Sequence, residues 1–589
     1  MGQGAQFGNQ STGNLVISGP VSGKQTYRGL YAADDFHWTS KLTLNLGLRY
    51  ELQGPWSERY NRLTYFDQKA ANLSVTGCSG TPGSPCLGDV FLVETGRNTS
   101  RNSLPLSKTQ FMPRLGFAYA WNEKTVIRGG YGIFFIPNYV SFGVNPYIDP
   151  VSSATTPFFA SVNHGLTPNA SLSCQLDAAF TCIPGTGPFG ANLVAVPGRN
   201  PQPNVSQYIL NQNNFSSTGY FVQKYGYIQQ WNLDIQRDLG AGFYADVAYA
   251  GAHGVHLPAF NPNINQIPDS FITQAQAQFN QGQTPTIAQP VSVYPFSQPL
   301  PGGLGPGSLI QGQLDRPYPQ YAGLNLNGQG CCSSSYNALQ ATVNRRFGGG
   351  GTLLVAYTWS KLLSNTDTLT SWLEGSTTGG TGVPQDWNNL KMEYSLSSQN
   401  VANRLVISYV LDLPFGHGKK FGGSATGVKN ALIGGWGIDG VTTFQSGFPV
   451  KIQYAASTPL SSSGLLGNST LRPDVVGGCN KGLSVQPLLW FNPKCFVAPA
   501  AWSFGDEPRV DPSLKQDGVA NWDFAAFKSL MFGERVNLQF RAEFFNLFNS
   551  PTFGPPNGTC CIANNGNFGV VTSTVGNPRL LQFGLKLSF

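Results

Sequence analysis

Ten cysteines and five histidines are the residues of this chain considered first for covalent cross-linking and metal binding. The spacing of the cysteines favours disulfide formation. Three pairs lie at short spacing in segments rich in Gly, Pro and Ser: Cys78 with Cys86, Cys174 with Cys182, and Cys479 with Cys495. Such pairs are typical of loop disulfides in an oxidising compartment. Two doublets, Cys331-Cys332 and Cys560-Cys561, leave their pairing open, because adjacent cysteines bridge each other only with strain and the doublets could pair with one another.

The remaining chemical motifs are too incomplete for catalysis. His253 and His256 could share a metal ion, but no third ligand is evident and a His-Glu-x-x-His motif is missing, so two solvated loop histidines are the simpler interpretation. No Gly-x-Ser-x-Gly elbow is found, and the Gly-rich run at 302–307 lacks the Lys-Ser/Thr of a phosphate loop. We expect no enzyme, no metal site and no cofactor.

Composition narrows the class of protein. Only 11% of the 589 residues are charged, against about 25% in ordinary soluble domains. The net charge of +7 is not gathered into a basic block, so we expect no nucleic acid partner.

Apolar runs such as residues 353–357 are far shorter than the ~20 residues of a spanning helix. Residues 1–14 lack an export signal, so the chain is either cytosolic or its sequence starts late.

Apolar and polar residues alternate with a period of two through most of the chain, which predicts strands with one apolar face. In residues 42–50, for example, Leu42, Leu44, Leu46 and Leu48 alternate with Thr, Asn, Gly and Arg. About thirteen such strands are predicted. They begin near residues 25, 42, 111, 125, 224, 243, 334, 352, 402, 436, 521, 535 and 579.

The predicted connections alternate between short and long. The long ones run roughly over residues 52–110, 137–223, 253–333, 364–401, 447–520 and 549–578. Residues 414–435 form a Gly/Lys-rich link of intermediate length in a short-link position. Strands of about ten residues, joined by short turns at one end and long loops at the other, are typical of an antiparallel outer-membrane β-barrel.

A barrel turns its apolar face to lipid, because every backbone polar group in hydrocarbon must be paired. Five tryptophans lie near predicted strand ends, as an interfacial aromatic belt requires: Trp38, Trp121, Trp359, Trp436 and Trp522. A soluble β-sandwich or propeller also has alternating strands. Six long loops without periodicity of their own argue against that alternative.

Strand parity predicts an N-terminally truncated chain. If the last strand ends at Phe589 on the short-turn side, the first predicted strand also runs toward that side, whereas bacterial barrels usually have an even number of strands. We therefore expect residues 1–24 to be a remnant of an upstream barrel or loop, and residues 25–589 to be the C-terminal part of a larger barrel.

Seven segments in order along the chain resemble TonB-dependent outer-membrane receptors of the Oar-like type, a group that often carries a carboxypeptidase-regulatory-like domain. They are Asp34-Asp35-Phe36 with residues 42–51, Gln230-Trp231-Asn232-Leu233, Tyr357-Thr358-Trp359-Ser360-Lys361, Leu413-Pro414-Phe415-Gly416, Gly434-Gly435-Trp436, Gln445-Ser446-Gly447-Phe448-Pro449, and residues 540–549 (FRAEFFNLFN).

The resemblance implies a barrel of about twenty-two strands, an N-terminal plug and a box that contacts the TonB complex. Neither the plug, the box nor the regulatory-like domain is recognisable here, so TonB coupling is expected only through parts that this chain lacks. The implied function is TonB-dependent uptake of an extracellular nutrient, with a passive or adhesive barrel that presents surface loops as the alternative. The expected partners are outer-membrane lipid and the outer-membrane assembly machinery.

Candidate site residues fall into three sets. Polar residues expected to face the lumen, where they line a channel or pair with one another or with a plug, are Arg49, Glu51, Asn232, Asp234, Arg541 and Glu543. Exposed loop aromatics that would contact a carbohydrate or another bulky neutral ligand are Tyr321, Trp372, Trp387 and Trp490. The alternating apolar residues of the last strand, which we interpret as an assembly signal read by β-augmentation, are Phe583, Leu585, Leu587 and Phe589.

Overall fold

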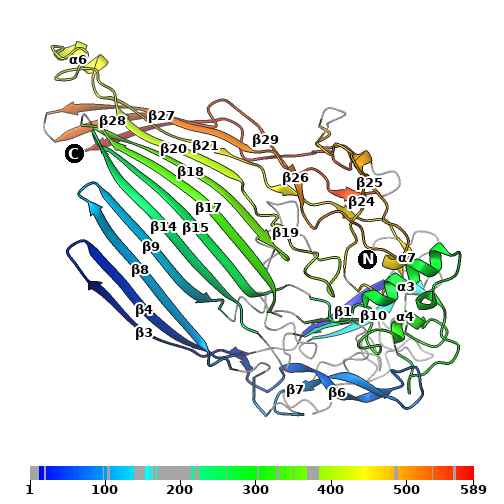
Figure 1. Ribbon diagram of the computed structural model, residues 1–589. Coiled ribbons are helices and arrows are strands. Elements are labelled where there is room, and N and C mark those ends of the chain that lie inside the picture. Colours follow the sequence, from blue (N-terminus) through cyan, green and yellow to red (C-terminus); the bar gives the residue numbers. More distant parts are fainter. Residues whose placement is uncertain are drawn as a thin grey trace, which may run out of the picture.

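A computed structural model shows thirteen consecutive antiparallel strands forming one curved sheet, here called the wall (Figure 1). The structure describes residues 12–18, 22–96, 99–102, 106–137, 153–159, 161–162, 167–168, 214–217, 224–259, 262–300, 304–326, 330–348, 350–367, 384–467, 469–482, 488–533, 535–561 and 566–589. The wall strands are β3 (Tyr27–His37), β4 (Leu42–Gln53), β8 (Gln110–Asn122), β9 (Thr125–Phe135), β14 (Tyr227–Gly240), β15 (Phe243–Pro258), β17 (Gly330–Arg346), β18 (Gly351–Ser364), β20 (Asn403–Asp412), β21 (Trp436–Gln445), β27 (Val519–Phe532), β28 (Val536–Phe545) and β32 (Leu580–Ser588). These are the thirteen strands that the periodicity predicts, so the predicted antiparallel fold is confirmed.

The register of the wall places apolar side chains in continuous rows on one face. One such row crosses seven strands through Leu44, Phe117, Gly129, Leu233, Tyr249, Leu339 and Trp359. The adjacent row, on the opposite face, contains Asn45, Gly116, Gly130, Asn232, Ala250, Ala338 and Ser360. Because successive side chains point to opposite faces, one consistent register suffices to separate an apolar face from a polar one.

Short turns join the wall strands at one end. The β3–β4, β8–β9, β14–β15, β17–β18 and β27–β28 connections are only a few residues long, and the β20–β21 connection is longer and carries α6 (Gly427–Ile433). In the turn between β14 and β15, Gly240 and Gly242 both have positive φ, a conformation that side chains with a Cβ rarely adopt. Long connections join the strands at the other end, as predicted.

The long connections fold into a compact loop region at the far end of the wall (Figure 1). It contains α3 (Asp269–Asn280), η4 (Thr286–Ala288), α4 (Gln311–Leu314), α7 (Pro459–Ser462) and η5 (Pro493–Cys495). Its strand pairs are β1 (Thr12–Ser18) with β10 (Ser153–Phe159), β2 (Gly23–Lys24) with β5 (Ser57–Glu58), β6 (Thr64–Thr76) with β7 (Pro85–Leu92), β11 (Ser161–Val162) with β12 (Thr167–Pro168), β13 (Asn214–Ser217) with β16 (Gly323–Leu326), β22 (Pro449–Val450) with β26 (Asp511–Lys515), β23 (Gln453–Tyr454) with β30 (Thr559–Cys560), β24 (Asp474–Val475) with β25 (Phe496–Val497), and β29 (Thr552–Phe553) with β31 (Thr574–Val575). β19 (Ser395–Leu396) extends the wall beside β18.

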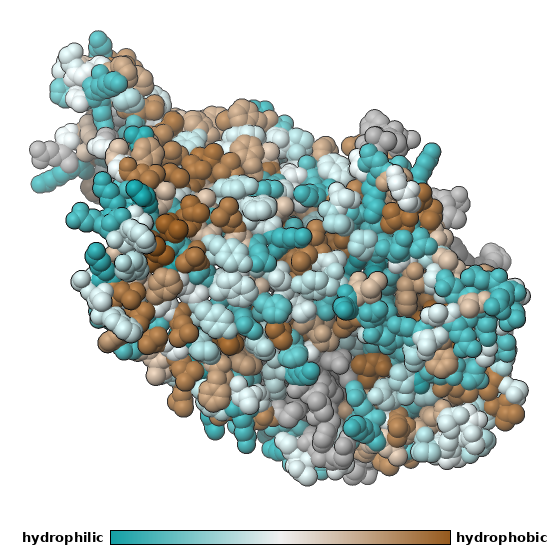
Figure 2. All heavy atoms as spheres, in the orientation of Figure 1, coloured by the Kyte–Doolittle hydropathy of each residue, from teal (hydrophilic) through white to brown (hydrophobic). Residues whose placement is uncertain are grey.

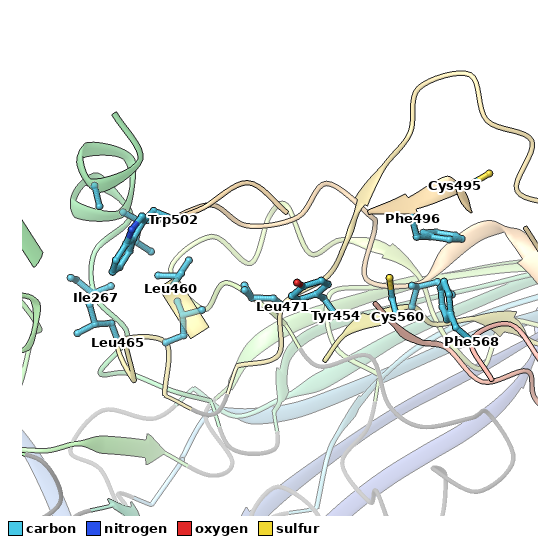
Figure 3. Close-up of a cluster of buried hydrophobic side chains, with 14 of the residues drawn as sticks. Ile267, Tyr454, Leu460, Leu465, Leu471, Cys495, Phe496, Trp502, Cys560 and Phe568 are labelled. Atoms are coloured by element: carbon cyan, nitrogen blue, oxygen red, sulfur yellow. The ribbon is translucent and has the colours of Figure 1, made fainter. Parts of the chain in front are cut away.

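Two buried clusters hold the loop region together. One surrounds Phe66 and Leu324, and the other draws its side chains from three of the long connections (Figure 3). In the second cluster, the rings of Phe491, Phe496 and Phe568 meet edge to face, with centroids 5.2–5.7 Å apart. The loop region therefore has a conventional hydrophobic core, although the sequence predicted no periodicity there.

The surface reflects this division (Figure 2). Apolar side chains gather over the wall near β27 and β28, whereas hydrophilic atoms cover the region around α3. Among the described residues, no helix is both long enough and apolar enough to cross a membrane.

Candidate functional site

Two adjoining cavities run along the polar face of the wall beside β21, β27, β28 and β32. The upper cavity, of about 560 Å³, lies at the loop end, and the lower one, of about 180 Å³, lies nearer the middle of the strands. Both are lined by Asp523 and Phe545, so we treat them as one groove.

Three asparagines, Asn521, Asn546 and Asn577, line the upper part of the groove together with apolar residues such as Val519 and Leu580. Asn546 fixes the rim: its backbone N–H donates to Asp523 Oδ1 over 3.0 Å, and its side-chain amide donates to the carbonyls of Ser550 and Asn577. Its φ of 50° lies in the left-handed region, which Asn tolerates better than most residues. The rim thus presents amide and carboxylate groups next to the apolar ring of Phe545.

Charge dominates the lower part of the groove. Arg541 donates to Asp439 over 2.9 Å and to Glu543 over 3.0 Å. Asp439 Oδ1 has no hydrogen-bond partner among the described residues. With Asp523, the groove therefore carries three carboxylates and one guanidinium, an acidic balance that disfavours anionic ligands.

The predicted lumen residues of the other strands lie on the same face and form local pairs. Arg49 Nε and Glu51 Oε1 are 2.5 Å apart, and Tyr27 and Gln53 also donate to the Glu51 carboxylate. The lumen residues were predicted either to line a channel or to pair with one another or with a plug. Arg49 pairs with Glu51, and Arg541 pairs with Glu543.

Asn232 and Asp234 lie on β14, away from the groove. Asn232 lines a separate cavity beside Arg114 and Tyr131. Gln236 bridges Asp234 and Asp246, at 3.4 and 2.9 Å. These residues share a face with the groove without contributing to it.

The expected loop aromatics are less open than the sequence suggested. Tyr321 is only 1% exposed, because it packs against Phe66 and its hydroxyl accepts a hydrogen bond from Asn72. The expectation that Tyr321 is exposed was therefore wrong. Trp387 and Trp490 are half-buried, and Trp490 Nε1 donates to the carbonyl of Lys515 over 2.6 Å. Trp372 lies outside the described residues.

Disulfides cross-link the loop region. Cys78 is bonded to Cys86, and Cys479 to Cys495. Cys560 is bonded to its neighbour Cys561, whereas Cys331 and Cys332 are free, so the doublets do not pair with one another. Cys174 and Cys182 lie outside the described residues.

A buried charge cluster lies beneath the Cys479–Cys495 disulfide. Lys481 Nζ is 2.7 Å from both Glu507 Oε2 and Asp511 Oδ2. Burial and the neighbouring Asp511 carboxylate raise the pKa of Glu507 to about 8, although Lys481 lowers it in part. Burial also opposes ionisation of Asp511, but hydrogen bonds from Lys481 and Ser513 hold the pKa of Asp511 below its usual range. The cluster therefore carries one carboxylate charge for one ammonium near neutral pH, which suits a structural role.

No group of three or more His, Cys, Asp or Glu side chains in the described parts of the chain could hold a metal ion. The predicted assembly residues lie on β32, which pairs with β28 on one side and ends the sheet path on the other. Phe583, Leu585 and Leu587 point to the apolar face with Phe540 and Leu538, and Phe589 is 97% exposed.

Comparison with known proteins identifies the class. The model of the family described as outer membrane beta barrel domain matches residues 5–582, so the chain belongs to this family. The apolar face of the wall is therefore the lipid-facing side, its polar face lines the lumen, and the protein is located in the outer membrane. No curated protein matches the sequence.

Several solved structures of outer-membrane proteins are similar to this chain. They include the transporter YddB from Escherichia coli, with 8% identity, a TM-score of 0.41 and coverage of 96% of this chain and 45% of that chain. The ferripyoverdine receptor of Pseudomonas aeruginosa has 10% identity, a TM-score of 0.38 and coverage of 97% and 39%. The siderophore receptor PiuA from Acinetobacter baumannii has 7% identity, a TM-score of 0.35 and coverage of 96% and 43%. The chain spans less than half the length of these proteins.

Sequence reasoning missed most of the groove. It singled out Arg541 and Glu543, but not Asn521, Asp523, Asn546 or Asn577. The signal for Asn546 was present in the segment at residues 540–549, whose asparagines follow directly on a predicted strand. Asn521 and Asn577 stand 56 positions apart in the sequence, so only the fold brings them together.

Proposed function

We propose that this chain is the barrel part of an Oar-like TonB-dependent receptor, and that it binds a bulky, neutral, hydroxyl-rich nutrient such as a carbohydrate. The observation that supports this ligand class is the groove at the loop end of the lumen, which Asn521, Asn546 and Asn577 line together with Phe545. Amides donate and accept hydrogen bonds in the pattern that hydroxyl groups require, and an aromatic ring offers an apolar face to a sugar.

The charge of the groove supports a neutral ligand over an anionic one. Three carboxylates against one guanidinium would repel a phosphate or a carboxylate-rich chelate. Trp387 and Trp490, on the loops, are proposed as additional contacts for a ligand that approaches from outside.

Energy coupling belongs to the same proposal. In TonB-dependent receptors it acts through a plug and a coupling box, so uptake is proposed for this barrel acting together with such parts. Without them, the barrel would bind its ligand at the cell surface, which is the function of the passive or adhesive alternative.

Binding to the purified chain in detergent micelles tests the ligand class. We expect a neutral oligosaccharide to bind and an anionic one of the same length not to bind. Asn521→Leu and Asn577→Leu should each weaken binding by about fivefold, the value of one neutral hydrogen bond. Asn344→Leu changes an amide that lines a different cavity on the wall and is the matched control. Equal binding by all three variants, or preference for the anionic oligosaccharide, would contradict the proposal.

Growth distinguishes the receptor from the adhesive alternative. A strain that lacks the complete receptor should lose growth on the bound oligosaccharide, and only a plug-containing protein should restore it. Normal growth of the mutant strain would favour the adhesive barrel.

We also propose that β32 is the strand that the assembly machinery recognises. Among the described strands β32 pairs only with β28, so its other edge offers backbone groups for β-augmentation. Deletion of Phe589 should lower the yield in the outer membrane, and an unchanged yield would contradict the assembly role.

A further inference from the structure

The β20–β21 connection differs from every other short connection of the wall. It spans residues 413–435 and folds into a small ordered unit. Phe421 N–H donates to the Pro414 carbonyl over 2.9 Å, and Asn430 Oδ1 accepts from the backbone N–H of His417 over 2.7 Å. We call residues 413–435 the lysine hairpin.

The lysine hairpin leaves large apolar side chains uncovered. Val428 and Leu432 are 77% and 67% exposed, and Phe415 and Phe421 are also exposed. Val428 and Leu432 are four residues apart on α6 and so lie on the same helix face. Buried residues are absent from α6, so its apolar face is not covered by the rest of the described chain.

The charge of the lysine hairpin has a single sign. Residues 413–435 contain three lysines, Lys419, Lys420 and Lys429, and no Asp or Glu. All three are exposed. Exposed apolar side chains beside several lysines are the composition of a segment that lies in the interface of an anionic membrane.

The apolar surface of the hairpin is continuous with the lipid-facing side of the wall. Trp436, the first residue of β21, donates from Nε1 to the Leu432 carbonyl over 2.9 Å. Lys528, on β27, donates to the Gly434 carbonyl over 2.7 Å and lies 4.8 Å from the centre of the Trp436 ring. In Figure 1, α6 stands off the wall at the short-turn end, beyond β20 and β21. Short turns of outer-membrane barrels face the periplasm, so the hairpin lies at the periplasmic end of the wall.

We propose that the lysine hairpin is a membrane anchor that lies on the periplasmic leaflet of the outer membrane. Val428 and Leu432 enter the boundary between headgroups and acyl chains, and the three lysines bind the phosphates of anionic phospholipids. The anchor would fix the tilt of β20 and β21, and it does not depend on the ligand proposed above.

Quenching by brominated lipid tests the anchor in the full chain, reconstituted in vesicles of phosphatidylethanolamine with or without phosphatidylglycerol. A bimane fluorophore is attached at Val428→Cys, Leu432→Cys or Ser424→Cys, and at Glu123→Cys in the short β8–β9 turn. Wild-type protein carried through the same labelling gives the background from native cysteines. We expect quenching at positions 428 and 432 to be about twice that at 424 and 123, and to increase with phosphatidylglycerol.

A second set of variants tests whether the three lysines of the hairpin are needed for binding to anionic lipid. The triple variant Lys419→Gln, Lys420→Gln, Lys429→Gln should lose the increase caused by phosphatidylglycerol, whereas Lys41→Gln with Lys124→Gln, in two other short turns, should keep it. Heat-dependent gel mobility verifies that each variant is folded. Quenching at 428 and 432 by aqueous iodide but not by brominated lipid would overturn the proposal. Protection from iodide only after addition of periplasmic proteins would also overturn it, in favour of a protein partner.

Discussion

The wall and the loop region use apolar residues in opposite ways. In the wall, Leu233, Tyr249 and Leu339 form an exposed row, and the polar side chains lie on the enclosed face. In the loop region, Leu460 (Figure 3) and Phe491 are fully buried, and hydrophilic atoms cover the region around α3 (Figure 2). One chain therefore folds against two solvents, lipid around the wall and water around the loops.

The ion pairs of the two regions also differ in how far they are buried. The Arg541 pairs of the wall are about one-third exposed to the lumen, whereas Arg509 and Asp367 in the loop region have no exposed side-chain surface. A buried pair is costly to break because a lone charge remains in an apolar environment, while a half-exposed pair is replaced by water at little cost. The contribution of an ion pair to stability therefore depends on its burial and not only on the residue types that form it.

The largest expected effect comes from breaking the buried pair of the loop region. Arg509 also donates to the Ser364 carbonyl over 2.6 Å and to the Glu393 carbonyl over 3.1 Å. Arg509→Met should lower the free energy of unfolding of the loop region by about 3–5 kcal/mol. Hydrogen exchange of residues 384–402 measures this change. Adding Asp367→Asn should restore part of the loss, and Arg59→Met, at an exposed arginine, should have no such effect.

A charge on the lipid-facing side of the wall should have the next largest effect. Leu48→Lys, opposite Ala32 and Pro113, places an ammonium in the lipid and should cost about 2–4 kcal/mol near the middle of the membrane. Asn45→Lys, three residues away on the lumen side, places the charge beside Asp35 and should be tolerated. Outer-membrane yield and heat-dependent gel mobility compare the variants. Equal yields would contradict the assignment of the two faces.

The pH dependence of the loop region should be smaller. The pKa of Glu507 is raised to about 8, so between about pH 4.3 and that value the folded protein holds a proton that the unfolded chain has released. The stabilisation is complete below the unfolded pKa and is lost as the pH rises through the folded pKa. From pH 6 to 7 the loss should be at most about 1.4 kcal/mol. Hydrogen exchange of residues 507–515 at the two pH values measures it, and Glu507→Gln should remove the dependence.

The smallest effect is expected in the groove. Arg541→Gln removes two ion pairs that are about one-third exposed or less, each with a value of about 0–1 kcal/mol, so the thermal midpoint should barely change. The groove becomes more acidic, and a cationic probe should bind more tightly than to the wild-type chain. A large loss of stability would show that these pairs resemble the buried ones of the loop region.

Local pattern predicted the wall well. A strand such as β4 needs only alternating residues to define its two faces, and short turns define its antiparallel neighbours. The loop region was harder to predict because its contacts join distant segments. α3 was missed because its apolar residues Phe271, Ile272 and Ala275 are interrupted by Thr and Gln. The burial of Tyr321 depends on Asn72 and Phe66, more than two hundred positions away.

The amino-acid pattern is enough to define the strands of the wall, their order and their two faces, because period-two alternation is a local property and an apolar face toward lipid is stabilising along each strand. Which loop residues are buried, and which polar groups line the groove together, depends on tertiary packing. Arg509 contacts Asp367 across 142 positions, and Asn521 and Asn577 line the same cavity although they are distant in sequence. Such contacts depend on how the long connections pack at the end of the wall. A local sequence pattern carries no information about that packing.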